Sequence, residues 1–419
     1  MVDHMTWISA AIFPRLSVSH SSPGGNSLLS MRSRLACIPH SLWRPRPAAP
    51  RPRLVDTTQR LARRIHLEPF LMPPIYFTGL LGALWLWKCM MLVVFQNKII
   101  YMPGMPPNSR RETIADYASE CRGIQWHENR TRAADGTSLA LAVANAHSKG
   151  EEASKGSGAG KESIAGHVYI LYFQGNASSI PPRLPYLSSV LRTLKDSKRA
   201  GLPPVQFTLV CLSYRGYWTS RGRPSEKGIR RDAEAGLRWI TQCHAETYAG
   251  SDRLAKPIVL LWGQSIGSGV ATNLAASSPP QPVLRVDGVI LETPFLSVRA
   301  MLEVLYPQKW LPYKRLWPFL RNQLDSWQNL GAIAEMSKAS GSKPPQMFIL
   351  EAGRDELVPQ EHGEKLEQRC IEVGLPVYKK TVHNAFHNEA ITRAEGRKAV
   401  TEFVLQQTQR HMDDTMSTD

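Results

Sequence analysis

The feature that most limits the fold of this chain is a series of short apolar runs that alternate with amphipathic stretches. Such runs are typical of parallel strands buried on both faces, and the amphipathic stretches between them predict crossover helices. The pattern therefore predicts an α/β fold with a doubly wound, mostly parallel sheet. The expected strands are His167–Phe173, Val205–Leu212, Pro257–Trp262, Val286–Leu291, Met347–Leu350 and Val377–Val382, and the expected helices are Pro185–Asp196, Ile229–His244, Gly267–Ala276, Glu361–Val373 and Thr392–Gln407.

One turn between an expected strand and an expected helix carries a reactive side chain. Gly263-Gln264-Ser265-Ile266-Gly267 has the form G-x-S-x-G, with an apolar strand before it and a helix of small residues after it. A serine on so tight a turn crowds its neighbours, so both glycines are needed for clearance. The amides at the start of the helix favour developing negative charge. Ser265 is therefore the candidate nucleophile.

A nucleophilic serine needs a general base and an acid that fixes the tautomer of that base, and behind such a turn they follow in the order serine, acid, histidine. Asp355 follows the strand Met347–Leu350 at the sheet edge where α/β sites form, and we expect it to be the acid. Two histidines, His383 and His387, follow the last strand. We assign His387 as the base because it lies beyond the strand end, and His383 is the alternative.

The same chemistry requires hydrogen-bond donors for a tetrahedral oxyanion, usually the amide after the nucleophile and one from the loop after the third strand. Ile266 supplies the first amide. The loop that begins at Gln174 contains a glycine that lets the backbone turn inward, so the N–H of Asn176 is the expected second donor. No cofactor is expected. A metal site is not expected either, because the HxxxH spacing of His383 and His387 lacks the HExxH glutamate and a third ligand nearby.

A long apolar segment precedes these elements. Leu71–Phe95 is a run of 25 residues with one charge, Lys88. At about 1.5 Å per residue, about 20 helical residues cross a hydrocarbon core of about 30 Å. We therefore expect a single transmembrane helix. A buried or interfacial helix is the alternative, since a lysine held at the bilayer centre is costly.

The formal net charge of +16 is concentrated at the N-terminal end. Residues 1–66 hold ten Arg and two Asp, so this segment carries half of the net positive charge of the chain. Their Arg, Pro and Ser content predicts a disordered tail and also resembles a mitochondrial transit peptide. No nucleic-acid-binding motif accompanies the arginines, so a nucleic-acid partner is not expected.

The charges that flank the apolar segment predict its orientation. Residues 50–69 hold five Arg, whereas residues 96–115 hold Lys98, Arg110 and Arg111. The more basic side stays in the cytosol, so we expect a single-pass protein with a cytosolic N-terminus in an endomembrane or the plasma membrane, and a mitochondrial location is the alternative. The sequon that begins at Asn129 would then accept a glycan.

The remaining segments complete the expected domain organisation. The main domain spans residues 97–410 and opens with a hairpin, and an aromatic-rich interval within it is either a cap over the site or a set of packed helices. These segments are the hairpin strands Ile124–Glu128 and Ser138–Asn145, a flexible Gly/Ser/Lys-rich insertion at 146–166, the aromatic-rich interval at 297–340 and a disordered tail at 411–419.

Six strings in this order carry a resemblance: YFQGNAS, SYRGYWTSRGRPSEKG, GQSIGSGVA, ETPFLS, EAGRDELVP and FHNEA. Over about residues 97–405 the chain resembles the membrane-anchored α/β-hydrolase-domain proteins of the fungal bud-emergence type and their animal relatives. The resemblance implies a serine hydrolase with the α/β-hydrolase fold that acts on acyl esters or thioesters of lipids or lipidated proteins. It places Ser265, Asp355 and His387 at the triad positions, and it makes the loop Tyr214–Tyr217 structural.

Two positions depart from the pattern of that family. Gln174 replaces the histidine of His-Gly-Asn-Ala, and Glu389 replaces the aspartate of His-Asn-Asp. The first change spares the backbone donor and the second spares the base, so activity is expected. The alternative is a catalytically idle α/β-hydrolase that serves as a membrane scaffold or adaptor. The sequence does not indicate an oligomeric state.

Overall fold

The computed structural model of the chain describes residues 68–148, 166–197, 204–249, 256–277, 284–308 and 315–416. The expected disordered tail at 1–66 lies outside the described residues. So do residues 149–165 of the expected insertion and residues 309–314 of the aromatic-rich interval.

Within the described residues, eight strands form one sheet in the order β1-β2-β4-β3-β5-β6-β7-β8. β1 pairs antiparallel with β2, as the expected hairpin requires, and β2 pairs antiparallel with β4. All the other neighbours are parallel, which confirms the predicted doubly wound, mostly parallel sheet. The strands are β1 Trp126–Arg132, β2 Ser138–His147, β3 Gly166–Phe173, β4 Val205–Leu212, β5 Ile258–Gln264, β6 Val286–Glu292, β7 Gln346–Ala352 and β8 Val377–Val382.

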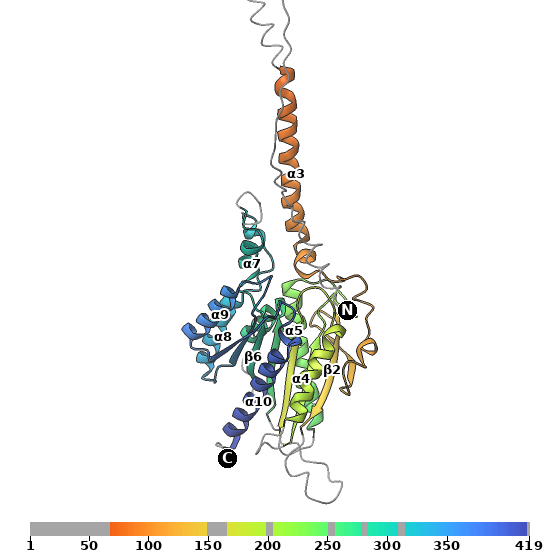
Figure 1. Cartoon of the computed structure of the whole chain (residues 1–419), viewed down its shortest axis with the longest axis vertical. Coiled ribbons are helices and arrows are strands. Elements are labelled where there is room, and N and C mark those ends of the chain that lie inside the picture. Colours follow the sequence, from red (N-terminus) through yellow and green to blue (C-terminus); the bar gives the residue numbers. More distant parts are fainter. Residues whose placement is uncertain are drawn as a thin grey trace, which may run out of the picture. The chain divides into compact units, whose positions relative to one another are not determined.

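Helices cover both faces of the sheet, and this explains why the central strands are apolar throughout. Every residue of β5 is buried. One core packs α4 and α10 against the sheet, and Figure 1 shows these two helices on the same face. The other core contains residues of α5, α6, α8 and α9. The bounds are α4 Leu184–Asp196, α5 Glu226–Thr247, α6 Ile266–Ser277, α8 Ser326–Ser340, α9 Gln360–Val373 and α10 Ala394–Met416.

The C-terminal helix continues past the expected end at Gln407. Residues 411–416, expected in a disordered tail, instead form the last turns of α10. Met412 is buried in the core against the sheet, and Asp414 pairs with Lys343 at 2.7 Å. These tertiary contacts explain why the helix extends beyond its apolar sequence pattern.

The aromatic-rich interval between β6 and β7 contains α7 Val298–Leu305, the short 3₁₀ helix η5 Trp317–Phe319, and α8. The α8 part is a packed helix, because Leu330 and Ile333 belong to the core and are buried. The η5 part is different, since Trp317 and Phe319 are exposed.

The apolar segment Leu71–Phe95 lies within α3, a helix of 34 residues from Glu68 to Tyr101. Among the described residues, α3 is the one helix long and apolar enough to cross a membrane. Its large apolar side chains point outward, with Phe77 63% and Leu86 64% exposed. Such exposure suits a helix that faces lipid rather than a protein core.

Candidate active site

The turn after β5 has the strained geometry that its sequence predicts. Ser265 has φ 51°, in the left-handed region that non-glycine residues rarely adopt. A Cβ on Gly263 would lie 2.1 Å from the carbonyl oxygen of Gly267, and one on Gly267 would lie 2.2 Å from that of Phe173. Only glycine fits at either position. The Ser265 amide donates to the Glu292 carbonyl at 2.8 Å, which fixes the turn to β6.

Three side chains from three strand ends meet at this turn. The Ser265 hydroxyl lies 3.0 Å from Nε2 of His387, which follows β8, and Nδ1 of His387 lies 2.8 Å from Oδ2 of Asp355, which follows β7. Because an ionised carboxylate only accepts hydrogen bonds, Nδ1 carries the ring proton and Nε2 is left to accept from the serine. The histidine is therefore oriented to take a proton from Ser265.

Backbone amides hold the acid in place. Oδ1 of Asp355 accepts hydrogen bonds from the amides of Leu357 at 2.9 Å and Val358 at 2.8 Å, which leaves Oδ2 for the histidine. The neighbouring carboxylate of Glu356 accepts from the amide of His387 at 2.9 Å. The loop after β7 thus positions both the backbone and the ring of the candidate base.

The alternative base, His383, lies away from the serine. Its side chain is 80% exposed and pairs with Glu395 at 3.3 Å. The structure therefore brings His387, and not His383, to Ser265.

The two expected oxyanion donors belong to the turn after β5 and to the loop after β3. Ile266 is the first residue of α6, and Asn176 is an exposed residue of the loop after β3. This loop is held by its neighbours. The Tyr214 phenol donates to the Gln174 carbonyl at 2.8 Å, and the Gln174 side chain donates to the Ala177 carbonyl at 3.2 Å.

The loop that contains Tyr214 is itself tied into the domain by a buried ion pair. Arg215 contacts Asp232 at 2.7 Å, and the amide of Arg215 also donates to this carboxylate at 2.9 Å. A second carboxylate, Asp135, lies 2.8 Å from the same guanidinium, which lowers the pKa of Asp135. The loop is anchored firmly enough for Tyr214 to act as a fixed support.

A buried polar network beside the candidate site is not evident from the sequence. Arg183 pairs with Glu292 at 3.0 Å, and Glu292 also accepts from the Trp262 indole at 3.0 Å. Arg183 donates to the carbonyl of Asn388 at 3.2 Å, and the side chain of Asn388 accepts from Gln264 at 3.2 Å. The network therefore joins the residue before the candidate nucleophile to the residue after the candidate base.

Burial raises the pKa of Glu292, and the nearby guanidinium of Arg183 opposes that shift. The available sequence signal was the ETPFLS string, which begins at Glu292. Its partner Arg183 is not near it in the sequence, so the string alone could not indicate the pair.

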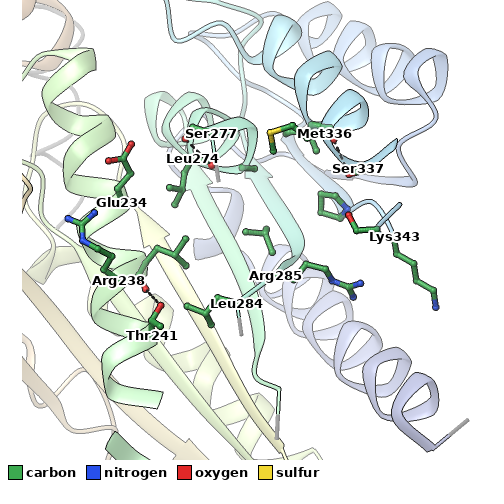
Figure 2. Close-up of a pocket in the computed structure, with 16 residues that line it drawn as sticks. Glu234, Arg238, Thr241, Leu274, Ser277, Leu284, Arg285, Met336, Ser337 and Lys343 are labelled. Carbon is green, nitrogen blue, oxygen red and sulfur yellow. Dashed lines mark hydrogen bonds between the residues drawn. The ribbon is translucent and has the colours of Figure 1, made fainter. Parts of the chain in front are cut away.

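Among the described residues, no group of three or more His, Cys, Asp or Glu side chains could hold a metal ion. A cavity of about 270 Å³ lies between α5, α6, α8 and the start of β6 (Figure 2). Leu284 and Val286 line it at the beginning of β6, whereas Ser265 follows the carboxyl end of the parallel strand β5. The cavity is therefore at the opposite edge of the sheet and is not part of the candidate site.

The mostly parallel sheet with helices on both faces matches a solved structure. A crystal structure of an α/β hydrolase from Vibrio vulnificus has a TM-score of 0.51 to this chain at 19% identity, and the match covers 75% of this chain and 92% of that chain. The chain therefore has the α/β-hydrolase fold. No protein-family model matches it.

Two curated relatives are similar in sequence. Protein bem46 of Schizosaccharomyces pombe is 27% identical over 199 residues, which cover 45% of this chain and 57% of that protein. The lysophosphatidylserine lipase ABHD12 of Danio rerio is 30% identical over 212 residues, which cover 48% of this chain and 46% of that protein. The chain spans about half the length of these relatives. They confirm its resemblance to the membrane-anchored α/β-hydrolase-domain proteins of the bud-emergence type.

Proposed function

We propose that this chain is a membrane-anchored serine hydrolase that cleaves acyl ester or thioester bonds. One observation carries the proposal: the ring of His387 bridges the Ser265 hydroxyl at 3.0 Å and the Asp355 carboxylate at 2.8 Å. An unrelated serine, histidine and aspartate would not be expected to align in this way at a strained strand-to-helix turn.

In the proposed reaction, Oγ of Ser265 attacks the acyl carbonyl while Nε2 of His387 takes the hydroxyl proton. Asp355 stabilises the imidazolium that forms. The carbonyl oxygen becomes an oxyanion, which accepts from the amides of Ile266 and Asn176. Collapse of this intermediate breaks the bond to the alcohol or thiol, and His387 donates its proton to that leaving group.

The acyl-enzyme is then hydrolysed by the same groups. Water replaces the leaving group, and His387 takes a proton from it as it attacks the acyl carbon. The second tetrahedral intermediate releases the carboxylic acid, and Ser265 regains its proton from His387. The chemistry needs no further reactant.

We propose a membrane lipid ester as the substrate. The membrane-spanning character of α3 and the similarity to a lysophosphatidylserine lipase support this class. A palmitoyl thioester on a protein also presents an acyl carbonyl to the serine, and preferential hydrolysis of such a thioester is the competing outcome of a substrate comparison.

Turnover of a soluble ester by the full chain in detergent tests the proposed reaction. Ser265→Ala is expected to abolish hydrolysis of 4-methylumbelliferyl butyrate with no change in melting temperature. Ser277→Ala is the matched control, because this serine lies at the other end of α6 and is exposed. Full activity in Ser265→Ala would reject the proposal. Comparing a lysophospholipid with a palmitoylated peptide then identifies the substrate class.

We further propose that the N-terminus is cytosolic, so that the hydrolase domain lies in the lumen or outside the cell. The arginines before α3 support this orientation. Asn129 lies on the edge strand β1, is partly exposed, and should then carry a glycan. The expected result is an endoglycosidase-sensitive mobility shift that is lost in Asn129→Gln. Digestion of the domain by protease added to intact microsomes would contradict this orientation.

A further inference from the structure

The described residues just before α8 present aromatic side chains to solvent. Residues 315–321, here called the aromatic arm, have the sequence RLWPFLR and include η5. Trp317 is 44% and Phe319 is 60% exposed. Two arginines flank the aromatics, and the arm has no acidic residue. Aromatic rings beside basic residues are the composition that proteins place at membrane interfaces.

The aromatic arm is fastened to the last turns of α3. The side chain of Gln96 donates to the Phe319 carbonyl at 3.1 Å and accepts from the Arg321 amide at 2.7 Å. The Arg321 guanidinium donates to the carbonyl of Val93 at 2.9 Å. These hydrogen bonds fix the position of the arm along the axis of α3, near Val93 and Gln96.

The attachment point lies at the end of the apolar part of α3. The apolar run Leu71–Phe95 is long enough to cross the bilayer core, and it ends one residue before Gln96. The string Gln96-Asn97-Lys98 is polar, as expected of the headgroup region. The arm is therefore attached to α3 where the helix changes from apolar to polar residues.

The arm is also linked to the candidate active site. Asn322 follows it directly, is buried, and contacts the phenol of Tyr101 at 3.1 Å. The Tyr101 carbonyl accepts from the Ala177 amide in the loop after β3 at 3.0 Å. Two residues thus connect the aromatic arm with the loop that we propose to hold the oxyanion.

On the basis of the membrane anchoring proposed above, we propose that Trp317 and Phe319 insert into the headgroup region of the bilayer that α3 spans. The partner is the lipid surface itself. Arg299, which stacks over the Trp317 ring at 4.2 Å, adds a cation that suits anionic headgroups. Insertion of these two rings would bring the loop after β3 to the membrane surface. A lipid ester could then enter the candidate active site from the bilayer.

Lipid contact can be measured without catalysis. p-Benzoylphenylalanine is placed at position 319 or, as a control, at position 371 of the full chain in phosphatidylcholine vesicles with some phosphatidylserine. Ile371 on α9 is a matched control, because it is 59% exposed. Irradiation is expected to give phospholipid adducts at position 319 and none at position 371. Equal adduct yields at the two positions, or none at position 319 in protein that resists carbonate extraction, would overturn the proposal.

Activity then tests whether the contact serves substrate entry. Phe319→Glu is expected to lower hydrolysis of 4-methylumbelliferyl oleate in vesicles roughly tenfold, the scale of losing one buried aromatic, and to leave soluble butyrate unchanged. Ile371→Glu should affect neither substrate. An equal fall on both esters, or no fall on either, would contradict the proposal. Absence of turnover in the unmodified protein would instead reject the hydrolase function and leave the lipid adducts to be judged separately.

Discussion

The carbonyl of Tyr101, the last residue of α3, accepts a 3.0 Å hydrogen bond from the amide of Ala177 in the loop after β3. The Tyr217 phenol donates to the same carbonyl. Ala177 has φ 56°, so its backbone conformation is an unfavourable one that outside contacts must support. The end of the membrane helix is therefore part of the framework of the candidate active site.

A pair of truncations tests this relationship. A chain that begins at Leu86 keeps Gln96 and Tyr101, and in detergent it is expected to hydrolyse 4-methylumbelliferyl butyrate as fast as the full chain. A chain that begins at Gly104 loses the support of the loop. We expect kcat/KM to fall by about 10² or more, the scale of losing one oxyanion donor. Tyr217→Phe, a milder change, should show a smaller loss in a protein that remains folded. Equal activity of both truncations would show that α3 acts only as an anchor.

The two histidines after β8 provide a matched pair. His387→Ala removes the group beside Ser265 and is expected to lower kcat by at least about 10³, because the serine loses its general base. His383→Ala removes an exposed side chain that pairs with Glu395, so kcat should stay within about threefold of the original, since exposed pairs contribute little. Steady-state kinetics on the soluble ester measure both. The reverse pattern in folded variants would assign the base to His383.

A histidine outside the site predicts how stability depends on acid. Burial lowers the pKa of His167 to about 3, and His244 contributes to the shift. Between that value and its ordinary value of 6.5, the unfolded chain binds a proton that the folded chain excludes. Above about pH 6.5, His167 therefore does not reduce the free energy of unfolding. As the pH drops below that value, the free energy of unfolding falls by at most about 1.4 kcal/mol per pH unit because of this residue.

His167→Phe removes this titration, although it also removes the 2.8 Å contact to Thr208. We expect the variant to be less stable near pH 7.5 but to lose less stability between about pH 7.5 and pH 5 than the original protein. Unfolding midpoints in detergent at the two pH values give the comparison, with His383→Phe as an exposed control. Parallel pH dependences in the variant and the original would mean that His167 is not a source of acid sensitivity.

The sequence located those features that depend on local order in the chain. Ser265 could be predicted as the candidate nucleophile because the strand, the two glycines and the helix are contiguous in the sequence. Asp355 and His387 could be predicted as its candidate partners because each follows a strand that ends at the same sheet edge. The expected strands Val205–Leu212 and Val377–Val382 agree with the observed bounds, because apolar runs between turn residues mark buried strands clearly.

Features that depend on distant pairs could not be predicted in this way. Arg183 and Glu292 are 109 residues apart, and Tyr101 and Asn322 are 221 residues apart. A buried charge is stable only with its partner, and the sequence pattern does not identify that partner. The extension of α10 to Met416 likewise depends on packing against the sheet rather than on its own sequence.

The central claim is that Ser265 is the nucleophile, and mass spectrometry of the protein labelled with a fluorophosphonate tests it most directly. The probe forms a covalent phosphonyl ester with an activated serine. After digestion, we expect one modified peptide, with the adduct on Ser265 and with labelling strongly reduced in His387→Ala. An adduct on a different serine, or no adduct on a folded protein that still hydrolyses esters, would contradict the assignment.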